Sequence, residues 1–302
     1  MDLRQLAAVV AVADHRSFSA AARVLHTVQS NVSTHIARLE RELGVLLVDR
    51  TTGQLTEEGA AVVERARRVQ GELEALVADV AAVNSAVTGV ARIGVIGTTA
   101  RWLVPRLLEA MAERYPGVQV VVVDATTTSL LPQLHNGQLD LAVLALPVHD
   151  PEVEAEPLFR EDLIVVAPLG HPLAALDRVT VQQLAEHELL LEPRGTAFRD
   201  DLETQAATAG VTLRTKAEVD GMRLLATLAF EGFGAAVLPA SASPRWSGID
   251  AKVVGVDGLT GRHVGLVRRR RGLPSAPARA ITEVIGDVIA QVAGNQPGIH
   301  PL

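Results

Sequence analysis

Residues 17–43 of the chain read SFSAAARVLHTVQSNVSTHIARLEREL. The pattern predicts a helix over residues 18–25, whose run of alanines lets a neighbouring helix approach closely, followed by a short turn. Apolar residues three or four apart predict a second helix over residues 29–43, with Gly44 as its stop. The residues that we expect on its inner face are Val32, Ile36, Leu39 and Leu43.

The outer face of the second helix is polar and uncharged at its start. Side chains of Gln, Asn, Ser and Arg carry the donors and acceptors that distinguish base pairs in the major groove of DNA. The segment therefore predicts a helix-turn-helix that binds DNA through this helix. A simpler alternative stays open, in which Ser30 and Asn31 only cap the helix. The charge of this region does not decide between the two, because residues 1–56 carry six arginines against five acidic residues, which is little excess positive charge for binding DNA.

Several short blocks of sequence occur in order in this amino-terminal part. They are MDLRQL (1–6), SFSAAA (17–22), VQSNVS (28–33), IARLE (36–40), LGV (43–45), DR (49–50) and LTEEG (55–59). On these blocks, the region resembles the winged helix-turn-helix of LysR-type transcriptional regulators. The resemblance implies that the residues facing DNA are Gln29, Ser30, Asn31, Ser33, Thr34, Arg38 and, at the wing, Arg50.

Two features depart from the family pattern. Val28 stands where the family commonly has serine, so we expect Thr27 to cap the recognition helix. The wing segment at residues 51–54 lacks the usual basic residues, which weakens its expected contacts with phosphates. The arginines left to carry the affinity are Arg38, Arg41 and Arg50.

A long helix without proline is predicted from Glu57 to about residue 88. Its apolar residues follow one another at spacings of four and three, the repeat of roughly 3.5 residues that is typical of a coiled-coil seam. The seam consists of Val62, Ala66, Val69, Leu73, Leu76, Val80, Val83 and Val87. We expect it to join two copies in a homodimer, which predicts an operator with two-fold symmetry. Packing of the helix on its own domain is the alternative.

From Val90 onward, short apolar strands alternate with amphipathic helices, which is typical of an α/β domain with a mainly parallel sheet. The strands are expected at residues 91–96, 118–123, 139–144, 163–166, 189–191, 216–219, 235–238 and 264–267. Blocks such as RIG (92–94), GQLDLA (137–142) and GFG (232–234) resemble the effector-binding half of LysR-type regulators, which is similar to periplasmic solute-binding proteins.

The expected fold is α+β overall, in three parts. These are a winged helix-turn-helix domain over residues 1–59, a linker and dimerisation helix over 60–89, and a two-lobed α/β effector domain over 90–302. Lobe one is expected at about 90–164 and 266–302, and lobe two at about 165–265. The resemblance implies crossover strands near Val165–Val166 and Gly265–Leu266, a linker helix between the two domains, and dimers that often pair into homotetramers.

The resemblance also implies a small-molecule effector held between the lobes. The residues mapped to this cleft are Thr98, Thr99, Ala100, Thr128, Ser129, Arg194, Gly195, Thr196, Phe198 and Phe233. Hydroxyls and backbone N–H groups at helix starts suit an anion, and Arg194 would add a bidentate contact, so we predict a small carboxylate. The alternatives are that Thr98 and Ser129 only cap helices and that Arg194 lies in a solvated loop.

Composition narrows the function further. The chain of 302 residues has a net charge of −7 and a pI near 5.7, which argues against a protein coated with nucleic acid. It has no cysteine, so disulfides, thiolate nucleophiles and cysteine-held metals are excluded. No apolar stretch approaches the ~20 residues that span a bilayer, and Met1-Asp2 opens no secretory signal, so we expect a cytoplasmic protein without membrane contact. Since the histidines stand singly, no metal and no cofactor are expected.

The sequence thus predicts a DNA-binding transcriptional regulator, not an enzyme. An effector-independent regulator is one alternative. An α/β enzyme using the same cleft is another, which the lack of a nucleophile–base pair, metal set or cofactor loop opposes. The basic run Arg268–Arg271 suggests either a second DNA contact or a solvated loop. The sequence does not indicate which molecule the effector is, which genes are regulated, or whether transcription is activated or repressed.

Overall fold

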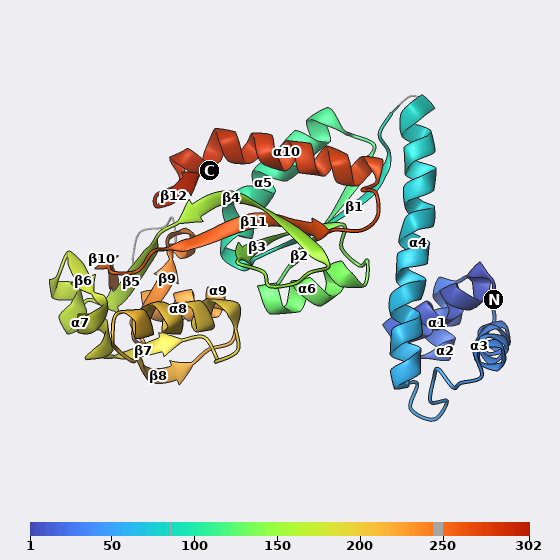
Figure 1. Cartoon of the computed structure of the whole chain (residues 1–302), viewed down its shortest axis with the longest axis horizontal. Coiled ribbons are helices and arrows are strands. Elements are labelled where there is room, and N and C mark those ends of the chain that lie inside the picture. The colour runs from blue at the N-terminus through green and yellow to red at the C-terminus, as the bar shows by residue number, and fades with distance from the viewer. Residues whose placement is uncertain (85, 244–249) are drawn as a thin grey trace. The chain divides into compact units, whose positions relative to one another are not determined.

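The computed structural model describes residues 1–84, 86–243 and 250–302, and the chain forms two compact units (Figure 1). Unit 1 consists of Met1–Asn84 with Asn136–Gln138, and unit 2 consists of Ser85–His135 with Leu139–Leu302. The first unit is built from helices, while the second contains two β-sheets. None of the helices in the described residues is long and apolar enough to cross a membrane.

Four helices form unit 1. They are α1 (Leu3–His15), α2 (Phe18–Val24), α3 (Gln29–Leu43) and α4 (Glu57–Asn84). Val9 and Val12 of α1 pack against Ile36 and Leu39 of α3, and all four side chains are fully buried. Leu43 was expected on the inner face but is 42% exposed, because it lies in the last turn of α3, past the part that the other helices cover.

The helix ends follow local hydrogen bonding. Ser17 caps α2 by accepting a bond from the Ala20 N–H, and Gly44 ends α3 with a φ of 73°, a left-handed conformation that suits glycine. The expected cap of α3 by Thr27 is wrong. Val28 is the N-cap residue and makes no side-chain bond, while the Thr27 hydroxyl instead accepts a bond of 2.9 Å from the Asn31 amide.

The wing is a short loop closed by a single antiparallel bridge between Val48 and Leu55. The Asp49 carboxylate accepts hydrogen bonds from the backbone N–H groups of Thr51 (2.7 Å) and Thr52 (3.2 Å), and these bonds hold its pKa below the usual range. Gly53 has a φ of 70°, and a Cβ there would lie 2.7 Å from the Arg16 carbonyl oxygen. The tip of the loop, residues 51–54, is therefore ordered without any basic side chain.

Unit 2 contains two six-stranded sheets in its described residues. The first has the order β12 (Ile299–Pro301), β4 (Val153–Glu161), β11 (Arg262–Arg269), β3 (Leu141–Leu146), β1 (Gly89–Val95), β2 (Val118–Asp124). The second has the order β6 (Arg178–Thr180), β10 (Ala251–Asp257), β5 (Leu163–Pro168), β9 (Ala235–Pro239), β7 (Glu188–Leu191), β8 (Arg214–Glu218). Strands β1, β2 and β3 are parallel, as are β7, β8 and β9.

Helices cover both sheets. They are α5 (Gly97–Arg114), α6 (Thr127–His135) and α10 (Ala276–Val292) on the first sheet, and α7 (Val181–Ala185), α8 (Ala197–Thr208) and α9 (Met222–Phe230) on the second. Three short 3₁₀ turns complete the described part: η1 (Pro172–Ala175), η2 (Ala240–Ala242) and η3 (Ala293–Asn295). In Figure 1, α5 and α10 lie together on one face of the first sheet, with α6 on the other.

The second sheet shows why its strands form where they do. Alternate residues of a strand point to opposite faces. Accordingly, Val165 and Val237 contribute to the core that α8 covers, whereas Val166 and Leu238 contribute to the core that α9 covers. Such continuous apolar runs are typical of strands that are buried on both faces.

The sequence did not predict β4, β6, β10 and β12. Strand β4 reads VEAEPLFRE, with four charged residues among its nine and a proline inside, so its pattern is weak. It nevertheless pairs with β11 along its length, with a register shift between Val264 and Gly265 that places Gly265 opposite Pro157. The pairing with β11, which lies far along the chain, therefore makes this segment a strand.

The chain changes sheets at two places. It passes from β4 to β5 at Asp162, and from β10 to β11 over residues 258–261. Val165–Val166, near which a crossover strand is expected, lies in β5, and Gly265–Leu266 lies in β11; these are the strands that follow the two crossings. Apolar runs mark the interior of a strand, whereas the crossings fall at the polar or glycine-containing breaks before them.

Candidate functional site

The polar face of α3 is exposed over the positions predicted to read DNA. Gln29, Ser30 and Arg38 are exposed, and Ser33 is half-buried. The Ser19 hydroxyl of α2 donates to Gln29 Oε1 at 3.0 Å, which fixes the orientation of this amide. Arg38 makes no hydrogen bond to any residue that the structure describes, so its guanidinium is available to a partner.

Two of the predicted DNA contacts bond within the protein. The Asn31 amide donates to Thr27, and the Thr34 hydroxyl donates to the Ser30 carbonyl oxygen at 2.8 Å. Both side chains are exposed but already have an acceptor nearby. The uncommitted groups of the face are therefore Ser30, Ser33 and Arg38.

Arg50 is held at the wing by a residue that the sequence analysis did not single out. Glu40 of α3 is 7% exposed and accepts hydrogen bonds from the backbone N–H groups of Leu47 (3.0 Å) and Val48 (3.4 Å). Its other oxygen accepts a bond of 3.1 Å from the Arg50 guanidinium. The Glu40 carboxylate therefore orders both the start of the wing and Arg50. Half of the Arg50 side chain stays exposed.

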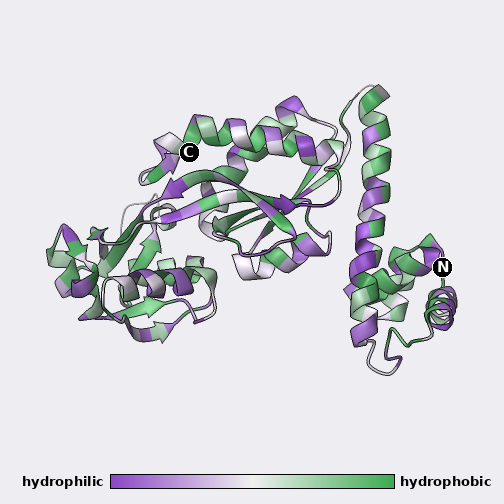
Figure 2. Ribbon diagram, viewed as in Figure 1, coloured by the Kyte–Doolittle hydropathy of each residue, from purple (hydrophilic) through white to green (hydrophobic). Residues whose placement is uncertain are grey.

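The predicted dimerisation seam divides into two parts. Val62 and Ala66 pack into the helix-turn-helix core of their own chain, together with Val63. The middle of the seam is exposed, where apolar residues recur along α4 (Figure 2). These exposed residues are Val69, Leu73, Leu76, Val80 and Val83, with exposed fractions from 39% to 87%. Val87 lies beyond the end of α4, because the chain turns there into β1.

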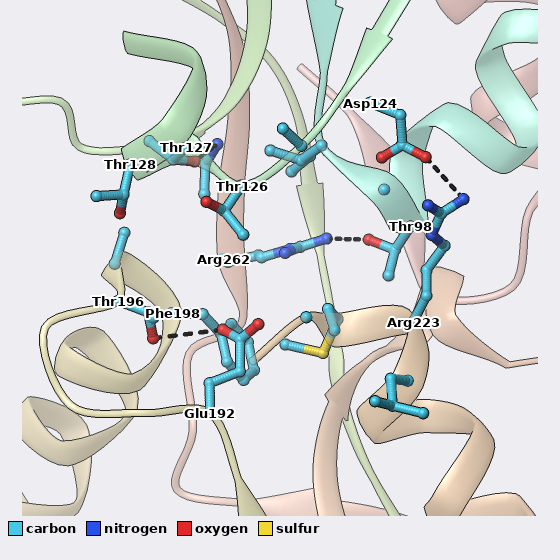
Figure 3. Close-up of a pocket in the computed structure, with 18 residues that line it drawn as sticks. Thr98, Asp124, Thr126, Thr127, Thr128, Glu192, Thr196, Phe198, Arg223 and Arg262 are labelled. Atoms are coloured by element: carbon cyan, nitrogen blue, oxygen red, sulfur yellow. Dashed lines mark hydrogen bonds and ion pairs between the residues drawn. The ribbon is translucent and has the colours of Figure 1, made fainter. Parts of the chain in front are cut away.

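Unit 2 contains a cavity of about 400 Å³ between its two sheets (Figure 3). Its walls come from residues just past the carboxyl ends of β1, β2 and β7, together with the start of α9. Ligands of parallel α/β sheets usually bind beyond these strand ends. The polar and charged side chains on its walls are Thr98, Asp124, Thr126, Thr127, Thr128, Glu192, Thr196, Arg223 and Arg262.

Four of the predicted effector residues line this cavity: Thr98, Thr128, Thr196 and Phe198. The other six lie outside its lining. Thr99 and Ala100 are buried in α5, while Ser129, Arg194, Gly195 and Phe233 are exposed. The Arg194 guanidinium donates to Glu203 at 3.3 Å. It therefore does not supply the bidentate contact on which the carboxylate prediction relied.

Arg262, at the start of β11, is the arginine that the cavity does contain. Its guanidinium binds Glu161, the last residue of β4, at 2.8 Å, and donates to the Thr98 hydroxyl at 2.7 Å. The second oxygen of Glu161 accepts a bond of 2.6 Å from the Ser241 N–H. Since Glu161 and Arg262 are 0% and 7% exposed, this is a buried ion pair beside the crossovers. The sequence signal for this ion pair is Arg262 itself, a charged residue at the start of the largely apolar strand β11.

A second ion pair joins the two lobes of unit 2. Asp124 ends β2 of the first sheet, and Arg223 belongs to α9 on the second; they lie 2.7 Å apart. Arg223 is largely exposed, so this pair lies nearer to solvent than the buried one. Both arginines of the cavity therefore have carboxylate partners within the chain.

The basic run Arg268–Arg271, which begins in the last two residues of β11, is bonded to unit 2. Arg268 pairs with Glu154 at 2.5 Å, and Arg270 donates to the Val153 carbonyl at 3.2 Å. Arg269 donates to the carbonyls of Leu134 (2.8 Å) and Leu139 (2.7 Å). These bonds give the run a structural role and leave little support for a second DNA contact. In the described residues, no group of three or more His, Asp or Glu side chains is placed to hold a metal ion.

Two protein families match this chain. Residues 3–60 match the bacterial regulatory helix-turn-helix protein of the lysR family, and residues 84–290 match the LysR substrate binding domain. A probable hydrogen peroxide-inducible genes activator from Streptomyces viridosporus is 38% identical over 245 residues, which cover 80% of this chain and 78% of that protein. The DNA-binding transcriptional dual regulator OxyR of Escherichia coli is 31% identical over 293 residues, 96% of this chain and 95% of that protein.

Solved structures agree with this assignment. A full-length OxyR variant from Pseudomonas aeruginosa, in which a cysteine is replaced by aspartate, has a TM-score of 0.77 and 26% identity and covers 99% of this chain and 97% of that chain. The resemblance and the fold class predicted from the sequence are therefore confirmed. The chain belongs to the LysR family of DNA-binding transcription regulators and is not an enzyme.

Proposed function

We propose that this regulator binds its operator as a homodimer through α3 and responds to a small molecule bound in the cavity of unit 2. The observation that carries the proposal is the cavity itself, which has polar groups from both sheets beyond the strand ends. A ligand that contacts both lobes can prefer one separation of the lobes over another. Such a preference is what an effector needs to shift an equilibrium between states of a regulator.

The exposed middle of the α4 seam supports the homodimer. Leu73 and Leu76 are 40% and 60% exposed, and apolar side chains at this spacing are stabilised when a second helix covers them. Two copies of α3 related by a two-fold axis would read an operator with two-fold symmetry. Further pairing of dimers into a homotetramer belongs to the same proposal.

The response is proposed to be non-covalent. Relatives of this chain are named for hydrogen peroxide, and peroxide acts on proteins chiefly through cysteine thiolates, which it oxidises to sulfenic acids and disulfides. This chain has no cysteine. It therefore lacks the thiol that such a response requires, which favours reversible binding of a ligand.

Titration of the full-length protein against its own upstream intergenic DNA tests the proposal, with a random duplex as the control. We expect its own site to bind more tightly by a factor on the order of 10³, at several salt concentrations. Equal binding of both duplexes would exclude a sequence-specific regulator.

A second arm adds hydrogen peroxide before the titration and then removes it. Operator affinity should not change, because no thiol is available for oxidation. A reversible peroxide-dependent change in affinity would contradict the non-covalent mechanism. If no small molecule alters the footprint, the effector-independent alternative holds instead.

A further inference from the structure

Four charged side chains line the cavity, and three of them have a partner of opposite charge. Arg262 pairs with Glu161 and Arg223 pairs with Asp124. Glu192, which follows β7, forms no ion pair with any residue that the structure describes. The cavity and its supporting pairs thus hold three carboxylates against two guanidinium groups.

Glu192 is also poorly supplied with hydrogen bonds. It is 5% exposed, and its carboxylate has a single neighbouring donor, the Thr196 hydroxyl at 3.4 Å. The same hydroxyl lies 2.9 Å from the Pro193 carbonyl oxygen. Since a hydroxyl has one proton, the shorter bond to Pro193 takes precedence. The carboxylate is left almost without a donor, which is costly for a buried charge.

The position of Glu192 is nevertheless well defined. The Arg199 guanidinium, whose side chain is fully buried, donates to the Glu192 backbone carbonyl at 3.2 Å. Arg199 is fixed in turn by Glu203 at 2.6 Å and by the Thr215 hydroxyl at 3.1 Å. The bonds of Arg199 therefore fix the backbone of Glu192, whose carboxylate stays unpaired at the wall of the cavity.

The opposite wall presents hydroxyl groups. In Figure 3, Thr126, Thr127 and Thr128 lie on one side of the cavity and Glu192 on the other, with Arg262 between them. The Arg262 guanidinium uses Nε and Nη2 for Glu161 and Thr98, so its charge is already compensated. Arg262 also acts electrostatically on Glu192, but it is paired with Glu161, so Glu192 has no cation of its own among the described residues.

We infer that Glu192 anchors the effector and that the effector presents a protonated amine to it. The inference rests on the proposed function, since it assigns the chemistry of the same cavity. A carboxylate would add a fourth negative charge and leave Glu192 unpaired. A neutral ligand would shield Glu192 from water without pairing it. An ammonium group supplies both the charge and up to three N–H donors, and charge-assisted bonds of this kind are the strong ones.

Thermal unfolding of the full-length protein with matched small molecules tests this inference. The amines are ethanolamine and putrescine, the carboxylates are glycolate and succinate, and the neutral compound is ethylene glycol. Each is titrated against the wild type, Glu192→Gln, and a control variant, Glu218→Gln, whose carboxyl is exposed on β8 and is not part of the cavity lining.

The amines should raise the Tm of the wild type and of Glu218→Gln in a saturable way, and the carboxylates should not. For Glu192→Gln, we expect the apparent affinity for an amine to fall on the order of tenfold or more. Stabilisation by carboxylates but not amines would overturn the inference. So would an amine response that survives in Glu192→Gln, or the absence of any response in all three series.

Operator binding separates this inference from the proposed function. An amine that binds through Glu192 without changing operator affinity would support the anchor and contradict the effector role of the cavity. If the wild type shows no specific operator binding, the proposed function alone is contradicted.

Discussion

At the scale of single residues, two buried carboxylates of unit 2 differ in one respect, which is whether a cation accompanies them. Glu161 has Arg262 and the Ser241 N–H, whereas Glu192 has only a weak donor. Removing one member of a buried pair leaves the other charge unpaired, which is more damaging than the loss of a surface pair. The two residues should therefore respond to the same substitution in opposite ways.

Glu161→Gln should lower the free energy of unfolding of unit 2 by about 3 kcal/mol, because the Arg262 guanidinium would stay buried without its counter-ion. Chemical denaturation of the full-length protein checks this. The control is Glu154→Gln, which removes a half-exposed partner of Arg268 and should cost about 1 kcal/mol or less. Similar losses for both variants would show that the buried pair has no special weight.

Glu192 makes stability depend on pH. Its burial raises the pKa of the carboxyl above the ordinary value of 4.5, and Asp220 adds to this while Arg262 opposes it. A carboxyl with a raised pKa binds its proton more tightly in the folded state. The contribution of Glu192 is therefore most favourable below pH 4.5 and is lost as the pH rises through the raised pKa.

The Tm of Glu192→Gln relative to the wild type should consequently increase as the pH rises through this window. Glutamine cannot ionise, so the variant avoids the penalty of the buried charge. The Tm difference, measured at closely spaced pH values, checks the sign. A difference that stays constant with pH would mean that Glu192 does not titrate in this window.

At the scale of elements, α3 contains polar groups that are free and polar groups that are already bonded. Arg38→Ala should weaken specific operator binding by about 1–3 kcal/mol, as should Ser33→Ala if each makes a good base contact. Thr34→Ala is the matched control, because its hydroxyl already donates to Ser30. Footprinting with equal protection for all three variants would show that this face does not read the groove.

The same reasoning applies to α4. Leu76→Glu should raise the dimer dissociation constant more than tenfold, since a charge would enter the apolar seam. Light scattering over a range of protein concentrations measures this. Glu72→Gln, on an exposed position outside the seam, should leave the dimer intact. An unchanged dimer in Leu76→Glu would place the interface elsewhere.

At the scale of the whole molecule, the charge is unfavourable for DNA, with a net value of −7 and a wing without lysine. Few arginines then carry the electrostatic part of binding. Arg50→Gln should reduce the slope of log affinity against log salt by about one per protomer. Arg106→Gln, which removes an exposed charge in unit 2, should not alter the slope. Equal slopes for both variants would mean that Arg50 makes no phosphate contact.

Much of the architecture could be predicted from local patterns. The helices of unit 1 depend on apolar periodicity and on stops such as Gly44, and these act within a few residues. The buried strands of unit 2 could be predicted as well, because strands that are buried on both faces have continuous apolar runs. Strand β4, in contrast, contains four charged residues and Pro157, and its pairing with the distant strands β11 and β12 makes it a strand.

The residues of the candidate cavity likewise include some that the sequence could predict and some that it could not. Thr98, Thr128 and Thr196 were predictable because they follow strands or precede helices, places that the sequence marks. Arg262 and Glu161 are 101 residues apart, so their pairing could not be predicted from spacing. Local periodicity determined the helices of unit 1, including α3, and the buried strands of unit 2. Only the tertiary structure decided which charges meet, because contacts between distant segments depend on how the two sheets are assembled.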